Sequence, residues 1–517
     1  MSGRLDAVTL QVLNGALRAV CEEMGAVLVR AAHSANIKER RDASTALFDG
    51  RGEMVAQAEH IPVHLGSMPE AVAAVVEHDH SPGDTWILND PFAGGTHLPD
   101  ITLVSPLFAT GERVGFAASR AHHADVGGST PGSMPATSTT LAEEGVVIPP
   151  TLLVRAGELD RALLDDITSR MRGPRQRVAD LRAQLASNAL AAARMTEIAD
   201  RHGLALLEAG MRETLDYGER RTRACIDEFP DGLYRAADVL EDDAIEPRDL
   251  RVEATVTVSG SDVEIDFAGT APQTDGNLNC PLSVTRSAAY FVLRVLTDPD
   301  IPPSAGAYRP LRVTAPDGCL VNARPPAAVA GGNVETSSRI ADVLMLAFGR
   351  AIPVPALGQG TMNNLTLGND DFTYYETAAG GQGACPDADG PSAVHVAMSN
   401  TLNTPVEALE LEFPLRVREY SVRRGSGGAG RFRGGDGVVR ELEALAEMQF
   451  SLLTERRRHS PAGAEGGEAG RRGENLRVDA GGRAQRLPSK AQGSLQEGER
   501  LRIETPGGGG HGAPEKL

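Results

Sequence analysis

The segment 89–100 reads Asn89-Asp90-Pro91-Phe92-Ala93-Gly94-Gly95-Thr96-His97-Leu98-Pro99-Asp100, and the rest of the 517-residue chain is organised around it. An apolar run covers residues 101–108, and after a turn at Gly111 the chain continues to Ala121-His122-His123-Ala124-Asp125. Two apolar runs separated by a glycine turn predict two adjacent β-strands. Histidines and aspartates therefore gather where the first strand begins and the second one ends.

These polar side chains predict a metal site. Imidazole and carboxylate together suit Zn, Mn or Fe. A lone His-x-x-Asp, such as His97 with Asp100, is also typical of a hydrogen-bonded loop, but the His-His-x-Asp on the next strand favours a metal. The stretch contains no cysteine, which argues for an open site and against a closed structural zinc site.

The second strand ends in two consecutive histidines, His122 and His123. Successive side chains of a strand point to opposite faces of the sheet. Only one of the two can therefore face the ion directly, and spacing alone leaves open which one it is.

Composition limits the class of protein. The formal net charge is -19, which argues against nucleic acid and anionic membranes as partners. Five scattered cysteines form no Cys-x-x-Cys pair, and no run of about 18 apolar residues occurs. We expect a cytoplasmic protein that does not span a membrane.

The patterning predicts an α+β fold with several lobes. An N-terminal lobe, residues 1–230, combines long helices with a mixed sheet that carries the metal site. Apolar residues at three-four spacing predict its first helix at about 5–32, and Asp49-Gly50 predicts a hairpin turn, which places Asp42 just before the first strand of the hairpin. Residues 231–420 form a central α+β lobe, and residues 421–517 form a glycine-rich β lobe.

A nucleotide site is not predicted in this chain. The glycine-rich stretches do not follow a strand and precede a helix, as phosphate loops require. Two alternatives for anion binding are weighed: Gly332-Asn333 at the start of a helix, where an ordinary helix start is the simpler interpretation, and the run Gly507–Gly510, whose N–H groups can form an anion nest.

Several motifs together resemble the hydantoinase B/oxoprolinase family, and the resemblance runs essentially from end to end. Besides the segments above, it is carried by the following motifs: Glu39-Arg40-Arg41-Asp42, His60-Ile61-Pro62-Val63-His64, Gly332-Asn333-Val334-Glu335-Thr336-Ser337 and Thr505-Pro506-Gly507-Gly508-Gly509-Gly510. Members include B subunits of ATP-dependent hydantoinases, C-terminal halves of 5-oxoprolinases, and subunits of caprolactamase and of acetone and acetophenone carboxylases.

The resemblance implies a division of labour between two subunits. A hydantoinase A-type ATPase partner would bind ATP and activate the amide or ketone oxygen, and this chain would complete the reaction at a divalent metal, Zn or Mn. By position in the motifs, the ligands would be Asp42, His97, Asp100 and His122. We expect His123 or Asp125, each within a few residues of a ligand, to orient water or act as general base.

The favoured hypothesis is the B subunit of an ATP-dependent hydrolase that opens a hydantoin, 5-oxoproline or another lactam. One alternative is a subunit of an ATP-dependent ketone carboxylase, which would depend on bicarbonate. Another is a non-catalytic assembly partner with a structural metal, which the cysteine-free ligand set disfavours. In the first two cases we expect a hetero-oligomer with a small-molecule substrate.

Overall fold

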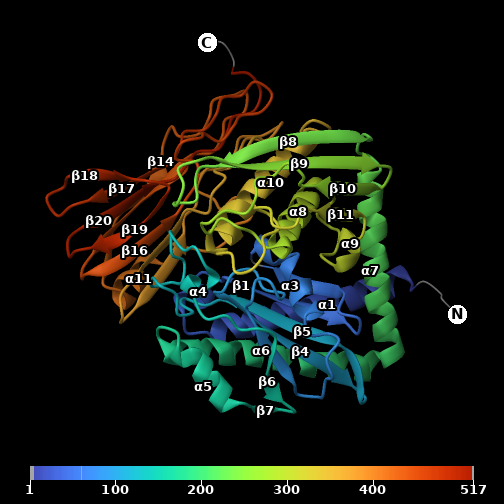
Figure 1. Ribbon diagram of the computed structural model, residues 1–517. Helices are drawn as coiled ribbons and strands as arrows, with labels where there is room; N and C mark the ends of the chain where they lie inside the picture. Colours follow the sequence, from blue (N-terminus) through green and yellow to red (C-terminus); the bar gives the residue numbers. More distant parts are fainter. Residues whose placement is uncertain (1–4, 60, 515–517) are drawn as a thin grey trace.

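Seven strands form the sheet that carries the candidate site, in a computed structural model that describes residues 5–59 and 61–514 (Figure 1). Their order across the sheet is β2 (Met54–Glu59), β1 (Ala43–Asp49), β5 (Glu112–His122), β4 (Asp100–Ala109), β3 (Thr85–Leu88), β6 (Thr151–Arg155) and β7 (Glu158–Leu159). All neighbouring pairs are antiparallel. The mixed pairing predicted for this sheet occurs instead in the second sheet.

Local sequence explains the first elements. Helix α1 (Ala7–Ala31) buries its apolar stripe, and the Asp6 carboxylate caps it by accepting from the Val8 and Thr9 N–H groups at 3.1 and 3.0 Å. The β1–β2 hairpin turns after Asp49, as predicted, with Gly52 at a φ of 83°.

Both faces of the first sheet are buried. Leu47 packs with α1, α6 (Pro174–His202) and α7 (Leu204–Ile226). Its neighbours Ala46 and Phe48 point the other way, into the large core that includes α3 (Ser67–Ala73) and α8 (Leu282–Leu296). This alternation along β1 follows from the two-residue period of a strand.

Three further sheets complete the α+β fold, which confirms the predicted class. The second has the order β11 (Leu311–Thr314), β10 (Asp262–Asp266), β9 (Leu250–Ser259), β8 (Gly232–Leu240), with β10 and β11 parallel. Strands β8 and β9 pack on α10 (Ser337–Phe348), which in turn packs on α8. The third contains β13 (Thr373–Thr377), β12 (Asn364–Gly368), β16 (Met448–Leu453) and β19 (Lys490–Leu495). The fourth contains β14 (Leu415–Arg423), β15 (Gly437–Ala444), β20 (Arg500–Glu504), β17 (Glu474–Val478) and β18 (Ala484–Leu487).

Short helices connect these layers. They are α2 (Ala35–Lys38), α4 (Leu141–Glu144), α5 (Arg161–Ser169), α9 (Ala305–Tyr308), α11 (Val406–Glu412), the 3-10 turn η1 (Pro62–His64) and the π-helical turn η2 (Gly332–Thr336). Among the helices within the described ranges, none combines the length and apolar character that crossing a membrane requires.

The lobe boundaries at residues 230 and 420 stay a prediction. The third sheet pairs β12, which precedes residue 420, with β16, which follows it. Strands from the central and C-terminal segments therefore share one sheet and one core, which contains Leu367 and Phe450.

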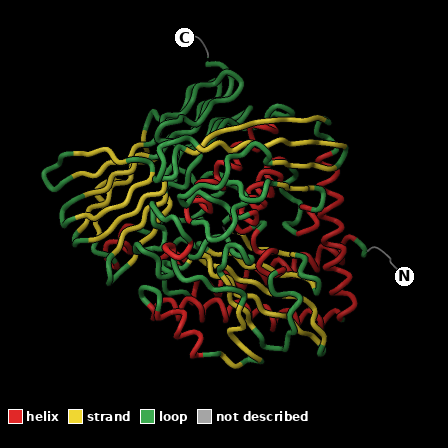
Figure 2. Tube along the Cα trace, viewed as in Figure 1, coloured by secondary structure: helices red, strands yellow, loops and turns green. Residues whose placement is uncertain are grey.

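The glycine-rich segments near the C-terminal end pack against one another as extended chain, shown as loop in Figure 2. Each N–H from Gly507 to Gly510 donates to a backbone carbonyl of another segment, at 2.8–3.1 Å. A Cβ at Gly508 would lie 2.1 Å from the Gln382 carbonyl oxygen, so only glycine fits this close approach. The four N–H groups are thus already bonded and do not form an open anion nest.

Candidate metal centre

Strand pairing brings the predicted ligands together. β4 begins at Asp100 and β5 ends at His122, and the two residues are direct partners across the antiparallel pair. His97 lies three residues before Asp100, in the loop that leads into β4. The three residues therefore meet at one end of the first sheet.

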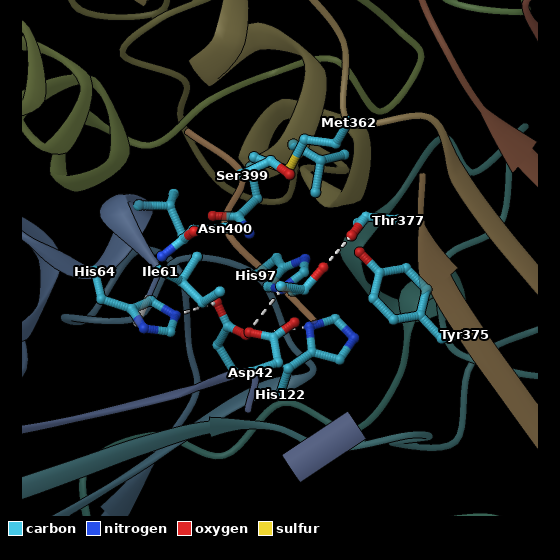
Figure 3. A pocket seen from close by; sticks show the side chains of 15 residues that line it. Asp42, Ile61, His64, His97, His122, Met362, Tyr375, Thr377, Ser399 and Asn400 are labelled. Atoms are coloured by element: carbon cyan, nitrogen blue, oxygen red, sulfur yellow. Dashed lines mark hydrogen bonds and ion pairs between the residues drawn. The ribbon is translucent and has the colours of Figure 1, made fainter. Parts of the chain in front are cut away.

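All three side chains are buried, and Figure 3 shows His97 and His122 among the residues that line the pocket. His97 Nε2 lies 3.1 Å from Asp100 Oδ1, and His122 Nδ1 lies 3.3 Å from the same oxygen. The Thr96 hydroxyl donates to Asp100 Oδ2 at 2.7 Å and fixes the carboxylate. Ligand atoms of His97, Asp100 and His122 all lie within 4.8 Å of one another, as binding of a single ion requires.

Asp42 lies at the edge of this cluster. Its backbone carbonyl accepts the His122 N–H at 3.0 Å, so the residue before β1 is tied to the end of β5. The Asp42 side chain lines the same pocket, although its carboxylate is outside the group of three ligand atoms that lie within 4.8 Å.

His64 is a member of the cluster that the sequence analysis did not assign. Its Nε2 lies 3.5 Å from Asp100 Oδ2, and its Nδ1 is hydrogen-bonded to the Ser44 hydroxyl at 2.8 Å. In the sequence, His64 is one of two histidines that flank Pro62. The other, His60, falls outside the described residues. Nothing in that spacing indicated which sheet edge the pair would approach.

Electrostatics favour a cation at this place. Burial alone would raise the pKa of the Asp100 carboxyl, but His97, His122 and His64 hold it well below its usual range. Burial lowers the pKa of His97, so its imidazole is neutral at pH 7 and keeps a lone pair for a metal. The site thus combines a fixed carboxylate with the neutral imidazole of His97.

The buried nitrogens of the cluster also fit a metal. Among the described residues, His97 Nδ1 and His122 Nε2 have no hydrogen-bond or ion-pair partner, whereas His97 Nε2 and His64 Nε2 face the Asp100 carboxylate. Buried polar atoms normally find a partner, because leaving them unpaired costs about 1–3 kcal/mol each. Imidazole and carboxylate donors without a thiolate are the ligands expected for Zn, Mn or Fe in an open site.

His123 and Asp125 are not brought to this cluster. His123 points to the opposite face of the sheet, where its Nε2 is 3.0 Å from Gln184 Oε1 on α6. The Asp125 carboxylate accepts from Arg172 at 3.1 Å and from the Gly127 and Gly132 N–H groups at 2.7 and 2.8 Å. Neither residue lines the pocket, so this geometry does not support the general-base role predicted for them.

The pocket above the cluster is lined by residues from distant parts of the chain, including Asn333, Met362, Tyr375, Thr377, Ser399 and Thr401. The Tyr375 ring stacks on His122, with 4.6 Å between centroids. The free space in the pocket is about 20 Å³, which holds a water-sized group. A ring-shaped substrate therefore requires the lining side chains to move apart.

Comparison with known proteins agrees with this geometry. The family model described as hydantoinase B/oxoprolinase matches residues 6–514. The chain belongs to this family. Residues Asp42 to Asp125 and the segments that line the pocket all fall within the matched range.

Three proteins to which the chain is similar illustrate the range of similarity. A 5-oxoprolinase of Dictyostelium discoideum is 39% identical, over 99% of this chain and 41% of that protein. A putative B subunit of a D-/L-hydantoinase from Pseudomonas sp. is 33% identical, over 99% of this chain and 90% of that protein. The crystal structure of the ATP-dependent caprolactamase from Pseudomonas jessenii matches with a TM-score of 0.92 and 28% identity, over 99% of this chain and 92% of that chain. This chain thus spans about two fifths of the 5-oxoprolinase's length.

Proposed function

We propose that this chain is the metal-bearing B subunit of an ATP-dependent hydrolase that opens a lactam, hydantoin or 5-oxoproline ring. The observation that carries the proposal is the buried His97–Asp100–His122 cluster, whose ligand atoms lie within 4.8 Å of one another. The family relatives named for 5-oxoprolinase, hydantoinase and caprolactamase support the choice of a cyclic amide as substrate.

Four residues would hold the ion in this proposal: Asp42, His97, Asp100 and His122. A bound Zn or Mn ion would polarise the substrate carbonyl and lower the pKa of a water molecule. The chain's own side chains orient the reaction around it. Thr96 keeps the Asp100 carboxylate in place, and Tyr375 supports the His122 ring from the pocket side.

Two pocket residues are assigned to substrate and proton. Asn333 Oδ1 is buried without a hydrogen-bond partner among the described residues, and it suits the N–H of a cyclic amide. His64 lines the pocket, with Ser44 holding its other nitrogen, and takes the general-base role first predicted for His123 or Asp125. His123 then acts as a positioning residue through its hydrogen bond to Gln184, and Asp125 acts as one through its hydrogen bonds to the turn at 127–132.

ATP would bind to a hydantoinase A-type partner subunit. This chain covers 41% of a 5-oxoprolinase but 90% of the putative hydantoinase protein from Pseudomonas sp., so the longer enzymes contain additional chain that has no counterpart here. The N–H groups of Gly507–Gly510, the best anion nest in the sequence, are bonded to carbonyls. Both observations support placing the ATP chemistry on a partner.

Co-expression with an A-type ATPase subunit tests the proposal. Lactams, hydantoins and ketones are screened for ATP turnover, with and without bicarbonate, and metal content is measured by elemental analysis. We expect about one Zn or Mn per chain and bicarbonate-independent turnover of a cyclic amide. Active enzyme without stoichiometric metal would refute the metal role, and bicarbonate-dependent ketone turnover would identify a carboxylase instead.

The His64→Gln variant tests the proton-transfer role separately. We expect it to keep its metal and to slow turnover by about 100- to 10,000-fold, the range of general acid–base catalysis. Loss of the metal from this variant would show that His64 is a ligand.

A further inference from the structure

A buried arginine stands behind the pocket without an anionic partner. The Arg40 side chain is fully buried, and its Nη2 donates to the hydroxyls of Thr377 and Thr401 at 2.8 and 2.9 Å. Its Nε and Nη1 have no hydrogen-bond partner within residues 5–59 and 61–514, and no carboxylate described there forms an ion pair with it. The guanidinium lies over the Tyr375 ring, 5.7 Å from its centroid, but a buried charge without an anionic partner is still costly, so this arrangement points to an anion that binds nearby.

The neighbouring carboxylate does not fill this role. Glu376 precedes Thr377 in β13, but its oxygens are held by Arg440 in two contacts of 3.1 Å and by the Tyr374 hydroxyl at 2.6 Å. Glu376 is therefore paired directly with its own arginine, and Arg40 acts on it only through space, by helping to lower the pKa of its carboxyl. The positive charge of Arg40 is left to act through the two threonines.

Both threonines line the metal pocket, and Figure 3 shows Thr377 on the wall across from His64. The two hydroxyl oxygens are 2.5 Å apart, so one hydroxyl donates to the other while both accept from Arg40. Two hydroxyls carry two hydrogens, and this bond uses one. When Thr401 donates to Thr377, the Thr377 hydrogen remains available to a ligand oxygen in the pocket; in the other arrangement the Thr401 hydrogen can go to that oxygen or to His395 Nε2, 3.4 Å away.

The loop around Thr401 is held in place by its own contacts. The Leu402 N–H donates to the Arg40 carbonyl at 3.0 Å, and the Thr401 hydroxyl lies 3.4 Å from His395 Nε2. His395 in turn bonds to the Ser399 hydroxyl, which also lines the pocket. Because the free space is about 20 Å³, an oxygen that touches these hydroxyls also lies close to the ligand cluster.

We propose that Thr377 and Thr401, with Arg40 behind them, form a subsite that binds a negatively charged oxygen of the substrate. The subsite deepens the proposed function and rests on it for the identity of the substrate. Hydroxyl donors backed by a cation bind an oxyanion more strongly than neutral donors do. Two oxygens have this chemistry: one on a phosphoryl group that activates the amide, and one on a carboxylate attached to the ring.

Calorimetric titration of the purified chain with inorganic phosphate and with formate tests the subsite. The variants are Thr377→Val, Thr401→Val and the double substitution, with Thr373→Val as the matched control on the same strand but outside the pocket. We expect each pocket variant to weaken anion binding by about 10- to 100-fold, the effect of losing a hydrogen bond to a charged group. The control and Thr401→Ser, which keeps the hydroxyl, should bind as the wild type does.

The two anions separate the two sources. If the pocket substitutions weaken the binding of phosphate alone, the subsite is assigned to the phosphoryl oxygen. If they weaken the binding of formate alone, it is assigned to a ring carboxylate. Both anions bound equally by wild type and double variant, or neither bound by the wild type, would overturn the subsite. Circular dichroism checks that each variant is folded. If the double variant does not fold, the comparison of the single variants with Thr401→Ser shows whether anion binding depends on the hydroxyls.

The same titrations distinguish this inference from the proposed function. They are run on the chain with and without added Zn, and metal content is measured for every variant. A chain that keeps its metal but shows no hydroxyl-dependent anion binding refutes the subsite alone. A chain that holds no metal yet binds anions through the two hydroxyls refutes the metal role and keeps the subsite.

Discussion

The substitutions His122→Ala and His123→Ala should have opposite consequences, although the two residues are adjacent. His122 contributes one of the three ligand atoms that lie within 4.8 Å of one another. His123 lies on the other face of β5 and is bonded to Gln184. We expect the first variant to lose metal and the second to lose stability.

The magnitudes follow from the contacts. Even residues that only support a metal ligand cost about 10–100-fold in affinity when removed, so loss of His122 itself should exceed that range. His123→Ala removes a fully buried ring and leaves Gln184 Oε1 without its partner at 3.0 Å. An unsatisfied buried acceptor and the cavity around it together cost about 2–4 kcal/mol of the free energy of unfolding.

Two measurements separate these outcomes. Elemental analysis after gel filtration gives the metal content, and urea denaturation of the metal-free proteins gives the free energy of unfolding. His33→Ala serves as the control, because the His33 side chain is exposed and the substitution should change neither quantity. If His123→Ala loses the metal while His122→Ala keeps it, the assignment of faces along β5 is wrong. If both variants keep it, the cluster is not the metal site.

Removing the metal with a chelator should lower the thermal midpoint of unfolding, since an ion that binds only the folded chain stabilises it; an unchanged midpoint after proven metal loss contradicts this. Glu335→Gln should flatten the pH dependence of stability. Burial, with the nearby Glu455 charge, raises the pKa of Glu335 from 4.5 to about 8, so between these values the folded chain keeps a proton that the unfolded chain loses. The free energy of unfolding then falls as pH rises, by roughly 1 kcal/mol per unit, and equal slopes for wild type and variant in urea denaturation would count against this. Gly508→Ala should destabilise by about 3 kcal/mol or more, because its Cβ would lie 2.1 Å from a carbonyl oxygen, whereas the exposed Gly15→Ala in α1 should stabilise by up to about 1 kcal/mol in the same assay.

The amino-acid sequence alone determined the local elements and the core of the candidate site. The three-four spacing of leucines predicted α1, and the Asp49-Gly50 turn predicted the β1–β2 hairpin. The turn between the two strands predicted that His122 or His123 would return to Asp100, the family resemblance selected His122, and the pairing of Asp100 with His122 across β4 and β5 agrees with that choice. These features depend on residues close in the chain, where backbone geometry and side-chain period decide the outcome.

Only the tertiary structure decided what surrounds those ligands. His64 reaches the Asp100 carboxylate because the turn after it packs against α8, where the Gly66 N–H bonds to Ser287 Oγ at 2.9 Å. Tyr375 and Thr401 line the pocket although they are more than 250 residues from the ligands in the sequence. Tyr375 lies on β13 of the third sheet, and Thr401 lies in a loop that follows this strand. His123 was expected to face away from His122, yet its partner on α6 was not visible in the sequence, because helix-to-sheet packing sums many weak contacts that no local pattern encodes.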